Sequence, residues 1–463
     1  MFRVLEKAFP NRRSIIRRRI VPGIAGLSIG LICIVFALKA CASDPIIVNW
    51  TSTYQTIDGF GASSGGDVYK LSSRLMDAFY STAGPGIGLD FIRLKIYPDY
   101  EDCEGDEGAG HCVKVDAGPT LSTWDLANAQ AAVARGAKVV VGEWSPPGSM
   151  KSNGKYQGGG AFIGNEPNYR KLASIQSDFV VMLAKKYQIS IYSISPQNEP
   201  DMSQPSYPSC TWTAQQFHDY VPYLAEALDD AGYSGVKIML SEKSTWANSY
   251  DTVAMNDPAV AAKIDILAEH AYGSSPSILT WSNLSHQHIW ETEVSDFGTP
   301  DGSIASALIY ATQIHNWLTE VGVNAWFWWA LDDDQGEGKN CCLADSTGRL
   351  TKRAYAIGNW SKFVRPDWQR IGVTNNGPLL VSAFKGTEKE FAIVVVNNSR
   401  WPVLNQEFSL NGLVLSGFHV IPWVTSDSAS LAARAPIECH SSCADFQYSI
   451  PAKSIVTFQG GTE

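Results

Sequence analysis

Eight apolar runs alternate with segments of helical length between residues 56 and 331, and this alternation constrains the fold more than any other feature. Most of the runs are rich in Val, Ile, Leu or aromatic residues, which is typical of parallel strands buried on both faces. The runs are Thr56–Ala62, Asp90–Tyr97, Ala137–Trp144, Ile189–Pro196, Val236–Ser241, Ile264–Tyr272, His288–Glu293 and Ala325–Leu331. Eight strand–helix units over about 280 residues predict an α/β fold, the (β/α)8 TIM barrel.

A doubly wound open sheet is the alternative for such an alternation. It would need a glycine-rich phosphate-binding turn after the first strand, followed by a dinucleotide signature. Residues 59–65 (GFGASSG) are rich in glycine, but the glycines have the wrong spacing and no such signature follows. The barrel is therefore the favoured architecture.

After Ala354 the pattern changes to short alternating runs separated by Gly, Asn, Ser and Pro. The runs are Leu379–Phe384, Glu390–Asn397, Glu407–Leu410, His419–Thr425 and Ser454–Phe458. This pattern is typical of a small all-β sandwich. The run Ile46–Trp50 precedes the first barrel strand and could pair into the same sheet. We therefore expect a barrel over residues 51–351 and a side β-sandwich over residues 43–50 and 352–463, to which the N-terminal strand contributes.

The first 42 residues have the organisation of an export signal. The basic stretch Arg12–Arg19 precedes the apolar run Ile20–Leu38, and Ala40-Cys41-Ala42 supplies an A-x-A cleavage site. The apolar run has 19 residues, almost enough to span a bilayer, so an uncleaved membrane anchor through residues 20–38 is the alternative to a signal peptide. In either case we expect the rest of the chain to be exported, as a secreted, extracellular or periplasmic protein.

The net charge of −10 averages over two different parts of the chain. Residues 1–42 contain eight Lys or Arg and one Glu; without them the totals of 36 basic and 46 acidic residues fall to 28 and 45, so the exported part carries −17. A nucleic-acid-binding protein would normally show a basic face, so the charge argues against this class of partner. The chain has 15 Trp, and Trp-rich soluble chains often stack flat ligands such as sugars.

Export also changes how the nine cysteines are interpreted, because disulfides form in oxidising compartments. Two belong to the leader, and the remaining seven are Cys103, Cys112, Cys210, Cys341, Cys342, Cys439 and Cys443. Cys103–Cys112 and Cys439–Cys443 are close in sequence and are plausible disulfides. Cys210 could then pair with Cys341 or Cys342, which would leave one thiol free. No spacing typical of a zinc site supports the competing metal interpretation.

Polar and aromatic residues gather where the predicted strands end, which is the end of a TIM barrel that carries the chemistry. They are Arg93, Lys95, Tyr97, Glu143, Trp144, Gln197, Asn198, Glu199, Glu269, His270, Tyr272, Glu291, Glu293, Trp328, Trp329 and Asp332. Carboxylates on different strands, ringed by Trp, suit glycoside hydrolysis: one carboxyl protonates the leaving oxygen and the other attacks or stabilises the anomeric carbon. Structural ion pairs are the alternative interpretation of such Glu residues.

Several motifs carry a family resemblance. Ile194–Asp201 (ISPQNEPD) is similar to the Asn-Glu-Pro element after strand four of retaining (β/α)8 glycosidases, and residues 290–293 (WETE) resemble their strand-seven nucleophile element. Thr56–Ala62 (TIDGFGA) looks like the opening strand of glycoside hydrolase family 30. Ala356–Pro366 and Pro451–Ser454 are also similar to that family. The resemblance covers nearly all of the chain after the leader.

The resemblance implies double displacement with retention, with Glu199 as the general acid/base and Glu293 as the nucleophile. It implies that the sugar is contacted or oriented by Asn198, Trp144, Arg93, His270, Tyr272 and Trp329. Glu291 lies two residues from Glu293, where residues of a strand share a face, and only the family position selects between them. Glu143 and Glu269 are expected to be satisfied structural ion pairs.

No cofactor and no metal are expected. The family needs none, and neither the acidic run Asp332–Asp334 nor the pair His286 and His288 has the further spaced ligands that a metal site requires.

The resemblance leaves the polysaccharide open, because family 30 contains xylanases, β-1,6-galactanases, β-1,6-glucanases and glucosylceramidases. Similarity to the glucuronoxylanase-like branch favours a plant cell-wall xylan. That branch holds a glucuronate substituent with a basic residue on the strand-eight loop, whereas residues 330–339 are acidic with Lys339 as the one basic residue, which speaks against glucuronate dependence. A non-catalytic carbohydrate-binding surface protein is a further alternative. It predicts the loss of one carboxylate, and both are present.

Overall fold

The computed structural model describes residues 44–65, 70–107, 110–332, 340–345, 347–387, 389–413, 419–438 and 445–461. The expected leader, the pair Cys439 and Cys443, and most of the acidic loop after strand eight lie outside the described residues. Within the described ranges, no helix has the length and apolar character needed to cross a membrane.

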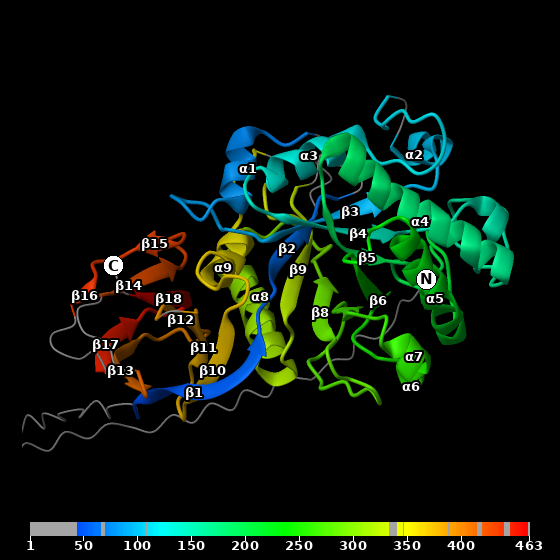
Figure 1. Ribbon diagram of the computed structural model, residues 1–463. Helices are drawn as coiled ribbons and strands as arrows, with labels where there is room; N and C mark the ends of the chain where they lie inside the picture. The colour runs from blue at the N-terminus through cyan, green and yellow to red at the C-terminus, as the bar shows by residue number, and fades with distance from the viewer. Residues whose placement is uncertain are drawn as a thin grey trace, which may run out of the picture. The chain divides into compact units, whose positions relative to one another are not determined.

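Eight parallel strands close into a barrel in chain order (Figure 1). They are β2 (Gly59–Ser63), β3 (Phe91–Ile96), β4 (Lys138–Glu143), β5 (Ile191–Ser195), β6 (Lys237–Lys243), β7 (Ile266–His270), β8 (His288–Glu293) and β9 (Ala325–Ala330). The last strand pairs with the first, with Gly59 opposite Ala325, so the barrel sheet has no free edge. Each strand overlaps one of the eight predicted runs, and the barrel prediction is confirmed.

Helices follow the barrel strands and cover the outside of the barrel (Figure 1). They are α1 (Ser73–Tyr80), α2 (Tyr100–Glu107), α3 (Thr123–Val133), η1 (Gly148–Met150), α4 (Glu166–Tyr187), α5 (Ala214–Asp230), α6 (Thr252–Asn256), α7 (Pro258–Ala261), α8 (Ile304–Asn316), η2 (Trp317–Val321) and α9 (Lys352–Ser361). The α4 helix illustrates their amphipathic pattern: Leu172, Phe179 and Leu183 are buried and recur on one face. The Asn165 side chain accepts from the Asn168 N–H and caps its N-terminus.

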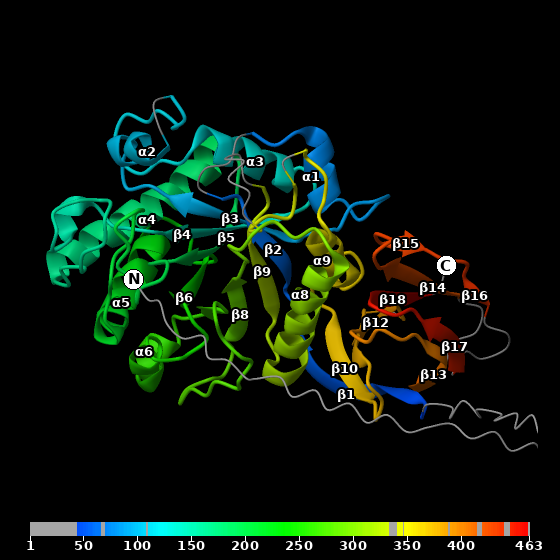
Figure 2. The ribbon, with the colours of Figure 1, turned by 180° about the vertical axis from the view of Figure 1, so that it is seen from behind.

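A second sheet of ten strands stands beside the barrel on the side of α8 and α9 (Figure 2). Its strands are β1 (Ile46–Thr56), β10 (Gln369–Thr374), β11 (Leu380–Lys385), β12 (Phe391–Asn397), β13 (Val403–Asn411), β14 (His419–Thr425), β15 (Ala432–Ala433), β16 (Ile437–Glu438), β17 (Asp445–Ile450) and β18 (Ser454–Gly461). Strand β1 pairs antiparallel with β10 and parallel with β13. The N-terminal strand therefore belongs to the C-terminal sheet, as predicted.

Buried hydrogen bonds fix the barrel to the second sheet. The Ile57 N–H, just before the first barrel strand, donates to the Trp368 carbonyl at 2.7 Å, just before β10. On α9, the Asn359 carbonyl accepts from the Thr457 hydroxyl of β18 at 2.7 Å, and the Trp360 indole donates to the Ser382 hydroxyl of β11 at 3.2 Å. The two parts of the fold are thus joined through α9 and through the link between β1 and β2.

Aromatic rings fill the interior of the barrel at the end where its strands begin. The rings of Phe91, Trp290 and Phe327 lie 5.2 to 5.5 Å apart between centroids. Gly61 makes room for them, because a Cβ atom at this position would lie 2.4 Å from a Phe327 ring carbon. The Asp58 carboxylate accepts from the Trp290 indole at 2.6 Å and so satisfies the polar atom of that ring. Free space inside the barrel is left at the opposite end.

We predict that Gly61→Ala destabilises the protein, because the added methyl group would overlap the buried Phe327 ring. Overpacking of this kind lowers the free energy of unfolding by about 1–3 kcal/mol. The matched control is Gly235→Ala, where a Cβ atom meets nothing within 4 Å and φ is not positive. Urea unfolding of both variants measures the difference. An equal loss in both variants would contradict the packing account.

Candidate active site

A cavity of about 740 Å³ opens where the barrel strands end. It is lined by Ser63, Gly65, Arg93, Lys95, Asp106, Asp125, Trp144, Asn198, Glu199, Met202, Gln204, Tyr207, Ser244, Thr245, Tyr272, Glu293, Phe297 and Trp329. Seven of the eight residues predicted to act on the sugar are in this lining. The eighth, His270, is fully buried and contacts Glu199 beneath the surface of the cavity. The structure therefore brings together all eight residues.

Glu199 and Glu293 present their carboxyl groups to one another in this cavity. Glu293 ends β8, and Glu199 lies four residues after the end of β5. A carboxylate oxygen of each residue and a His270 ring nitrogen all lie within 4.8 Å of one another. Glu199 has a φ of 45°, a left-handed conformation that residues other than glycine rarely adopt, and its N–H donates to the Glu242 carbonyl at 2.9 Å. Such conformations persist where the surroundings enforce them, often at functional positions.

The Arg93 guanidinium is the central cation of the site. It is fully buried on β3 and donates from Nη1 to the Glu293 carboxylate at 2.6 Å. From Nη2 it contacts the Asn198 side-chain oxygen at 2.6 Å and the Glu242 carboxylate at 3.1 Å. It also stacks over the Trp144 ring, 4.6 Å from the centroid. Arg93 therefore orients the residue before Glu199 and neutralises the charge on Glu293.

Each of the two carboxyl groups has its own additional donors. The Tyr272 hydroxyl donates to Glu293 at 3.0 Å. The Tyr207 hydroxyl donates to Glu199 Oε2 at 3.0 Å, and His270 Nδ1 lies 3.3 Å from Glu199 Oε1. Glu293 thus has the contacts of a carboxylate held in its ionised form. Glu199 has a histidine with which it can share a proton.

Burial and neighbouring groups shift the ionisation of both carboxyl groups and of His270. Burial raises the pKa of Glu293, against the opposing charges of His270 and Arg93. Burial would also raise the pKa of Glu199, but the His270 and Tyr207 contacts outweigh it and lower the pKa. Burial opposes protonation of His270, but the charges of both glutamates raise its pKa. These directions favour ionised Glu199 beside protonated His270, so the two residues share one proton across their contact.

Two tryptophans form walls of the cavity. The Trp144 and Trp329 rings lie 6.1 Å apart between centroids, beside the carboxyl groups. Trp144 follows β4 and is buried, and Trp329, on β9, is partly exposed. Flat apolar walls next to hydrogen-bonding groups suit a sugar ring, which has apolar faces and a polar rim.

Glu291, the alternative to Glu293 as the nucleophile, is not among the residues that line the cavity. Glu291 is fully buried and accepts from the Phe327 N–H at 3.1 Å. Residues two apart share a face only in a regular strand, and the pairing of β7 with β8 shifts register between Glu291 and Glu293. This irregularity gives the two side chains different surroundings.

Glu143 and Glu269 were expected in ion pairs, and this expectation is wrong. Glu143 accepts from the Gln176 side chain at 2.7 Å. Glu269 accepts from the Ser241 hydroxyl at 3.2 Å and from the Lys243 N–H at 3.0 Å. Burial raises the pKa of Glu143 to about 8 and that of Glu269 well above its ordinary value. A neutral, hydrogen-bonded carboxyl group is the favourable form in such surroundings.

Glu199, His270 and Glu293 are also the one group of potential metal ligands that the described residues bring together. The Arg93 guanidinium, 2.6 Å from Glu293, already supplies a positive charge at this place. The arrangement therefore fits acid–base chemistry better than a divalent cation. His288 does not join it, because it begins β8, whereas Glu293 ends that strand, and its Nδ1 contacts the Asp58 carboxylate at 2.6 Å.

The cysteine predictions have mixed outcomes. Cys103, on α2, and Cys112, after it, form a disulfide, as predicted. The predicted link from Cys210 to Cys341 or Cys342 is wrong. Cys210 is a buried thiol next to Lys151, whereas the other two pack against Ala330 at the end of β9. The pair Cys439 and Cys443 lies outside the described residues.

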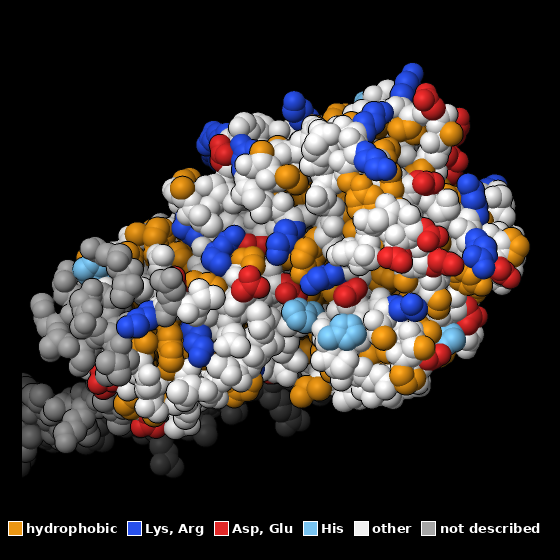
Figure 3. Space-filling model, viewed as in Figure 1, with side chains coloured by type: hydrophobic (Ala, Val, Ile, Leu, Met, Phe, Trp, Pro, Cys, Tyr) orange, Lys and Arg blue, Asp and Glu red, His pale blue; other side chains and the backbone are white. Residues whose placement is uncertain are grey.

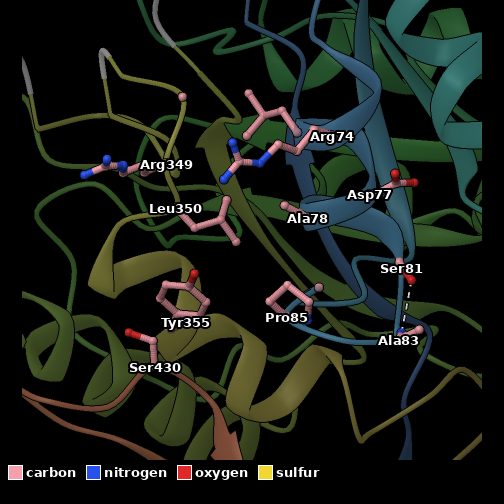
Figure 4. A pocket seen from close by; sticks show the side chains of 13 residues that line it. Arg74, Asp77, Ala78, Ser81, Ala83, Pro85, Arg349, Leu350, Tyr355 and Ser430 are labelled. Atoms are coloured by element: carbon pink, nitrogen blue, oxygen red, sulfur yellow. Dashed lines mark hydrogen bonds between the residues drawn. The ribbon is translucent and has the colours of Figure 1, made fainter.

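A second cavity, of about 590 Å³, lies on the outside of the barrel between α1 and α9 (Figure 4). Arg74 points into it above Leu350, and Tyr355 and Pro85 form its lower wall. It contains none of the residues predicted to act on a sugar. The chemistry is therefore assigned to the first cavity.

The chain is similar to glycoside hydrolases in both sequence and structure. The sequence model of the family described as Glycosyl hydrolase family 59 matches residues 58–371. The family model of the Glycosyl hydrolase family 30 beta sandwich domain matches residues 369–458. The solved structure of Xyn30A from Clostridium acetobutylicum, a glycoside hydrolase family 30 subfamily 8 xylanase, is 29% identical, with a TM-score of 0.77 over 91% of this chain and 100% of that chain. The chain belongs to glycoside hydrolase family 30. It is an O-glycosyl hydrolase, as predicted.

Two relatives of this glycoside hydrolase have names that refer to different substrates. The glucuronoxylanase XynC of Bacillus subtilis (strain 168) is 28% identical over 440 residues, which cover 91% of this chain and 93% of that protein. The endo-1,6-beta-D-glucanase of Neurospora crassa is 26% identical over 407 residues, which cover 76% of this chain and 79% of that protein. Both relatives have sequences of comparable extent to the present chain.

The sequence interpretation missed two residues of the site. Glu242 contacts Arg93 and lies at the end of β6, so the rule applied to the other strand ends would have found it. Tyr207 lies in an irregular segment eight residues after Glu199, and no periodicity or spacing indicates that its hydroxyl turns back to that carboxylate.

We predict that Tyr207→Phe moves the alkaline limb of the pH dependence of kcat/KM to higher pH. The hydroxyl stabilises ionised Glu199, so its removal raises the Glu199 pKa and keeps the proton needed for acid catalysis to a higher pH. A hydrogen bond to a charged group of about 1.5 kcal/mol corresponds to a shift of about one pH unit. Tyr54→Phe, at an exposed position on β1, is the control and should leave the profile unchanged. A shift to lower pH in Tyr207→Phe would contradict this role.

Proposed function

We propose that the protein is a secreted, retaining glycoside hydrolase that cleaves β-glycosidic bonds of a plant cell-wall polysaccharide, with xylan as the favoured substrate. The observation that carries the proposal is the facing of Glu199 and Glu293, whose oxygens lie within 4.8 Å in the cavity at the barrel strand ends. Retaining enzymes place their two carboxyl groups about 5–5.5 Å apart, so that one can attack the sugar directly. This spacing supports double displacement rather than attack by an intervening water.

In the first step Glu293 attacks the anomeric carbon while Glu199 protonates the departing oxygen. Glu293 remains ionised because Arg93 and Tyr272 donate to it. Glu199 obtains its proton across the contact with His270 Nδ1. When the sugar expels water from the cavity, a charged pair of His270 and Glu199 becomes less favourable than a neutral pair, so the proton moves to Glu199.

In the second step Glu199 removes a proton from water, which attacks the glycosyl-enzyme from the side that the leaving group vacated. The charge on Glu293 is now lost in the ester, and ionised Glu199 is stabilised by Tyr207 and His270. Asn198, held by Arg93 at 2.6 Å, is placed to hydrogen-bond the sugar 2-hydroxyl. That contact strengthens as positive charge develops on the ring in the transition state.

Xylan is favoured because the relatives aligned over about nine-tenths of the chain have xylan-degrading names, namely the glucuronoxylanase XynC and the xylanase Xyn30A. Endo-β-1,6-glucanase, β-1,6-galactanase and glucosylceramidase-type activities are the alternatives, since a 1,6-glucanase and putative glucosylceramidases also match the chain. On the face shown in Figure 3, Lys and Arg side chains are scattered among Asp and Glu, which fits a neutral polysaccharide better than a nucleic acid.

Secretion is proposed from the leader-like residues 1–42, with the apolar run 20–38 either cleaved or retained as an N-terminal membrane anchor. The disulfide between Cys103 and Cys112 supports an oxidising location. Mass spectrometry of the protein isolated from both the medium and the membranes of its native host distinguishes a cleaved leader from a retained one.

We predict that Glu199→Ala and Glu293→Ala respond differently to the leaving group. With a polysaccharide, loss of the general acid lowers kcat by about 10²–10⁴-fold. With an aryl glycoside whose phenol is acidic enough to leave without a proton, Glu199→Ala should form the glycosyl-enzyme at near the wild-type rate, whereas Glu293→Ala should remain inactive. Glu226→Gln, at an exposed position on α5, is the control. If the aryl glycoside restored activity to Glu293→Ala instead, Glu293 would be the general acid and Glu199 the nucleophile.

We predict that the enzyme cleaves xylan with and without uronate side groups. The wild-type enzyme should release reducing ends from glucuronoxylan and, because the loop after β9 is acidic, from xylan without uronate side groups at a rate within about tenfold. Glu293→Gln should release none from either polymer. Activity confined to β-1,6-galactan, β-1,6-glucan or glucosylceramide would contradict the xylan assignment and leave the catalytic assignment intact.

A further inference from the structure

We propose that Cys341 and Cys342 are joined by a vicinal disulfide, which holds the chain after β9 against the wall of the sugar-binding cavity. No disulfide between neighbouring residues was expected from the sequence. The proposal concerns a covalent modification and does not depend on the polysaccharide that the enzyme cleaves.

The geometry of the two side chains supports the bond. Their sulfur atoms lie 2.7 Å apart, closer than two unbonded sulfur atoms normally approach. Both residues are buried, with exposed fractions of 5% and 4%. Two sulfur atoms that face each other in a buried place need only a small movement to reach the bonded distance of about 2.05 Å.

The surrounding hydrogen bonds keep the two residues in place. Cys342 forms a parallel bridge with Ala330, the last residue of β9, and the Leu343 N–H donates to the Ala330 carbonyl at 3.2 Å. The Trp328 indole donates to the Cys341 carbonyl, and Arg353 Nη2 donates to the Cys342 carbonyl at 3.4 Å. The cysteine pair therefore lies on a backbone that is already attached to the barrel.

The bond would restrict the surface against which Trp329 packs. This residue packs against the cluster of Ala330, Cys341 and Cys342, and its ring forms part of the cavity lining. A disulfide would restrict the backbone at residues 341–342 and so restrict the surface on which Trp329 rests.

The bond forms by thiol–disulfide exchange with an exogenous disulfide, such as glutathione disulfide, in the compartment where the protein folds. One cysteine thiolate attacks a sulfur of the oxidant to give a mixed disulfide and releases the first thiol. The neighbouring thiolate then attacks the protein sulfur of the mixed disulfide and releases the second thiol. Two cysteine thiols are oxidised, one external disulfide is reduced, and the two protons pass to the released thiols.

Peptide mapping tests the proposal on the full chain, because trypsin places the cysteine pairs in separate peptides. Residues 340–349 contain Cys341 and Cys342 and no other cysteine. Residues 96–114 contain the Cys103–Cys112 disulfide and serve as the positive control, and residues 187–237 contain Cys210 as the thiol control. The protein, isolated from an oxidising medium, is denatured without reductant, alkylated with iodoacetamide, digested and weighed.

We expect peptide 340–349 to carry no alkyl group and to weigh two hydrogens less than the dithiol form, like peptide 96–114. Reduction before alkylation should add two alkyl groups to each of these peptides. The peptide with Cys210 should be alkylated in both samples. Two alkyl groups on peptide 340–349 without reduction, or its recovery linked to another peptide, would overturn the proposal. The peptide masses do not depend on catalytic activity, so this result can be judged even if the proposed activity is wrong.

Discussion

A single buried cation organises the active site of this enzyme. Arg93 is removed from water inside the barrel, and an unpaired guanidinium there would be strongly unfavourable. Its charge is balanced by Glu242 at 3.1 Å and Glu293 at 2.6 Å. Because the planar guanidinium has fixed donor directions, satisfying it also fixes the side chains around it. Glu293, Asn198 and Trp144, three of the residues predicted to act on the sugar, therefore lie where one buried arginine holds them.

The barrel supports this arrangement by being closed at one end. The rings of Phe91, Trp290 and Phe327 fill the interior where the strands begin, and Gly61 leaves the space that they need. Strand ends at the other side are left to carry polar groups around a cavity. None of the described residues of the second sheet lines this cavity. One face of this sheet, with Phe384, Val394 and Ile455, belongs to the same hydrophobic cluster as the barrel and α9. Its other face has a hydrophobic core of its own.

The architecture could be predicted from the sequence because it depends on periodic burial, which apolar runs record directly. All eight barrel strands, and the pairing of β1 with the C-terminal sheet, follow from that pattern. The strand-end rule also predicted a cavity with Glu199 and Glu293, although the choice of Glu293 over Glu291 came from the family resemblance. The structural reason for the difference is the register shift between β7 and β8, which no local pattern indicates.

Contacts formed between irregular segments could not be predicted. Tyr207 reaches Glu199 from a loop, and the surroundings of Cys210 differ from those of Cys341 although all three cysteines are buried. The expected ion pairs of Glu143 and Glu269 failed for a related reason. Charge alone predicts a cationic partner, whereas deep burial favours a neutral carboxyl group with uncharged donors.

The division of labour between Glu293 and Glu199 is tested most directly by trapping the glycosyl-enzyme. Glu199→Gln cannot activate water, so with an aryl xylobioside bearing a good leaving group the covalent intermediate should accumulate. Intact mass should then rise by one xylobiosyl group, and fragmentation should place that group on Glu293. A label on another carboxylate, or hydrolysis with inverted anomeric configuration and no adduct, would contradict the account.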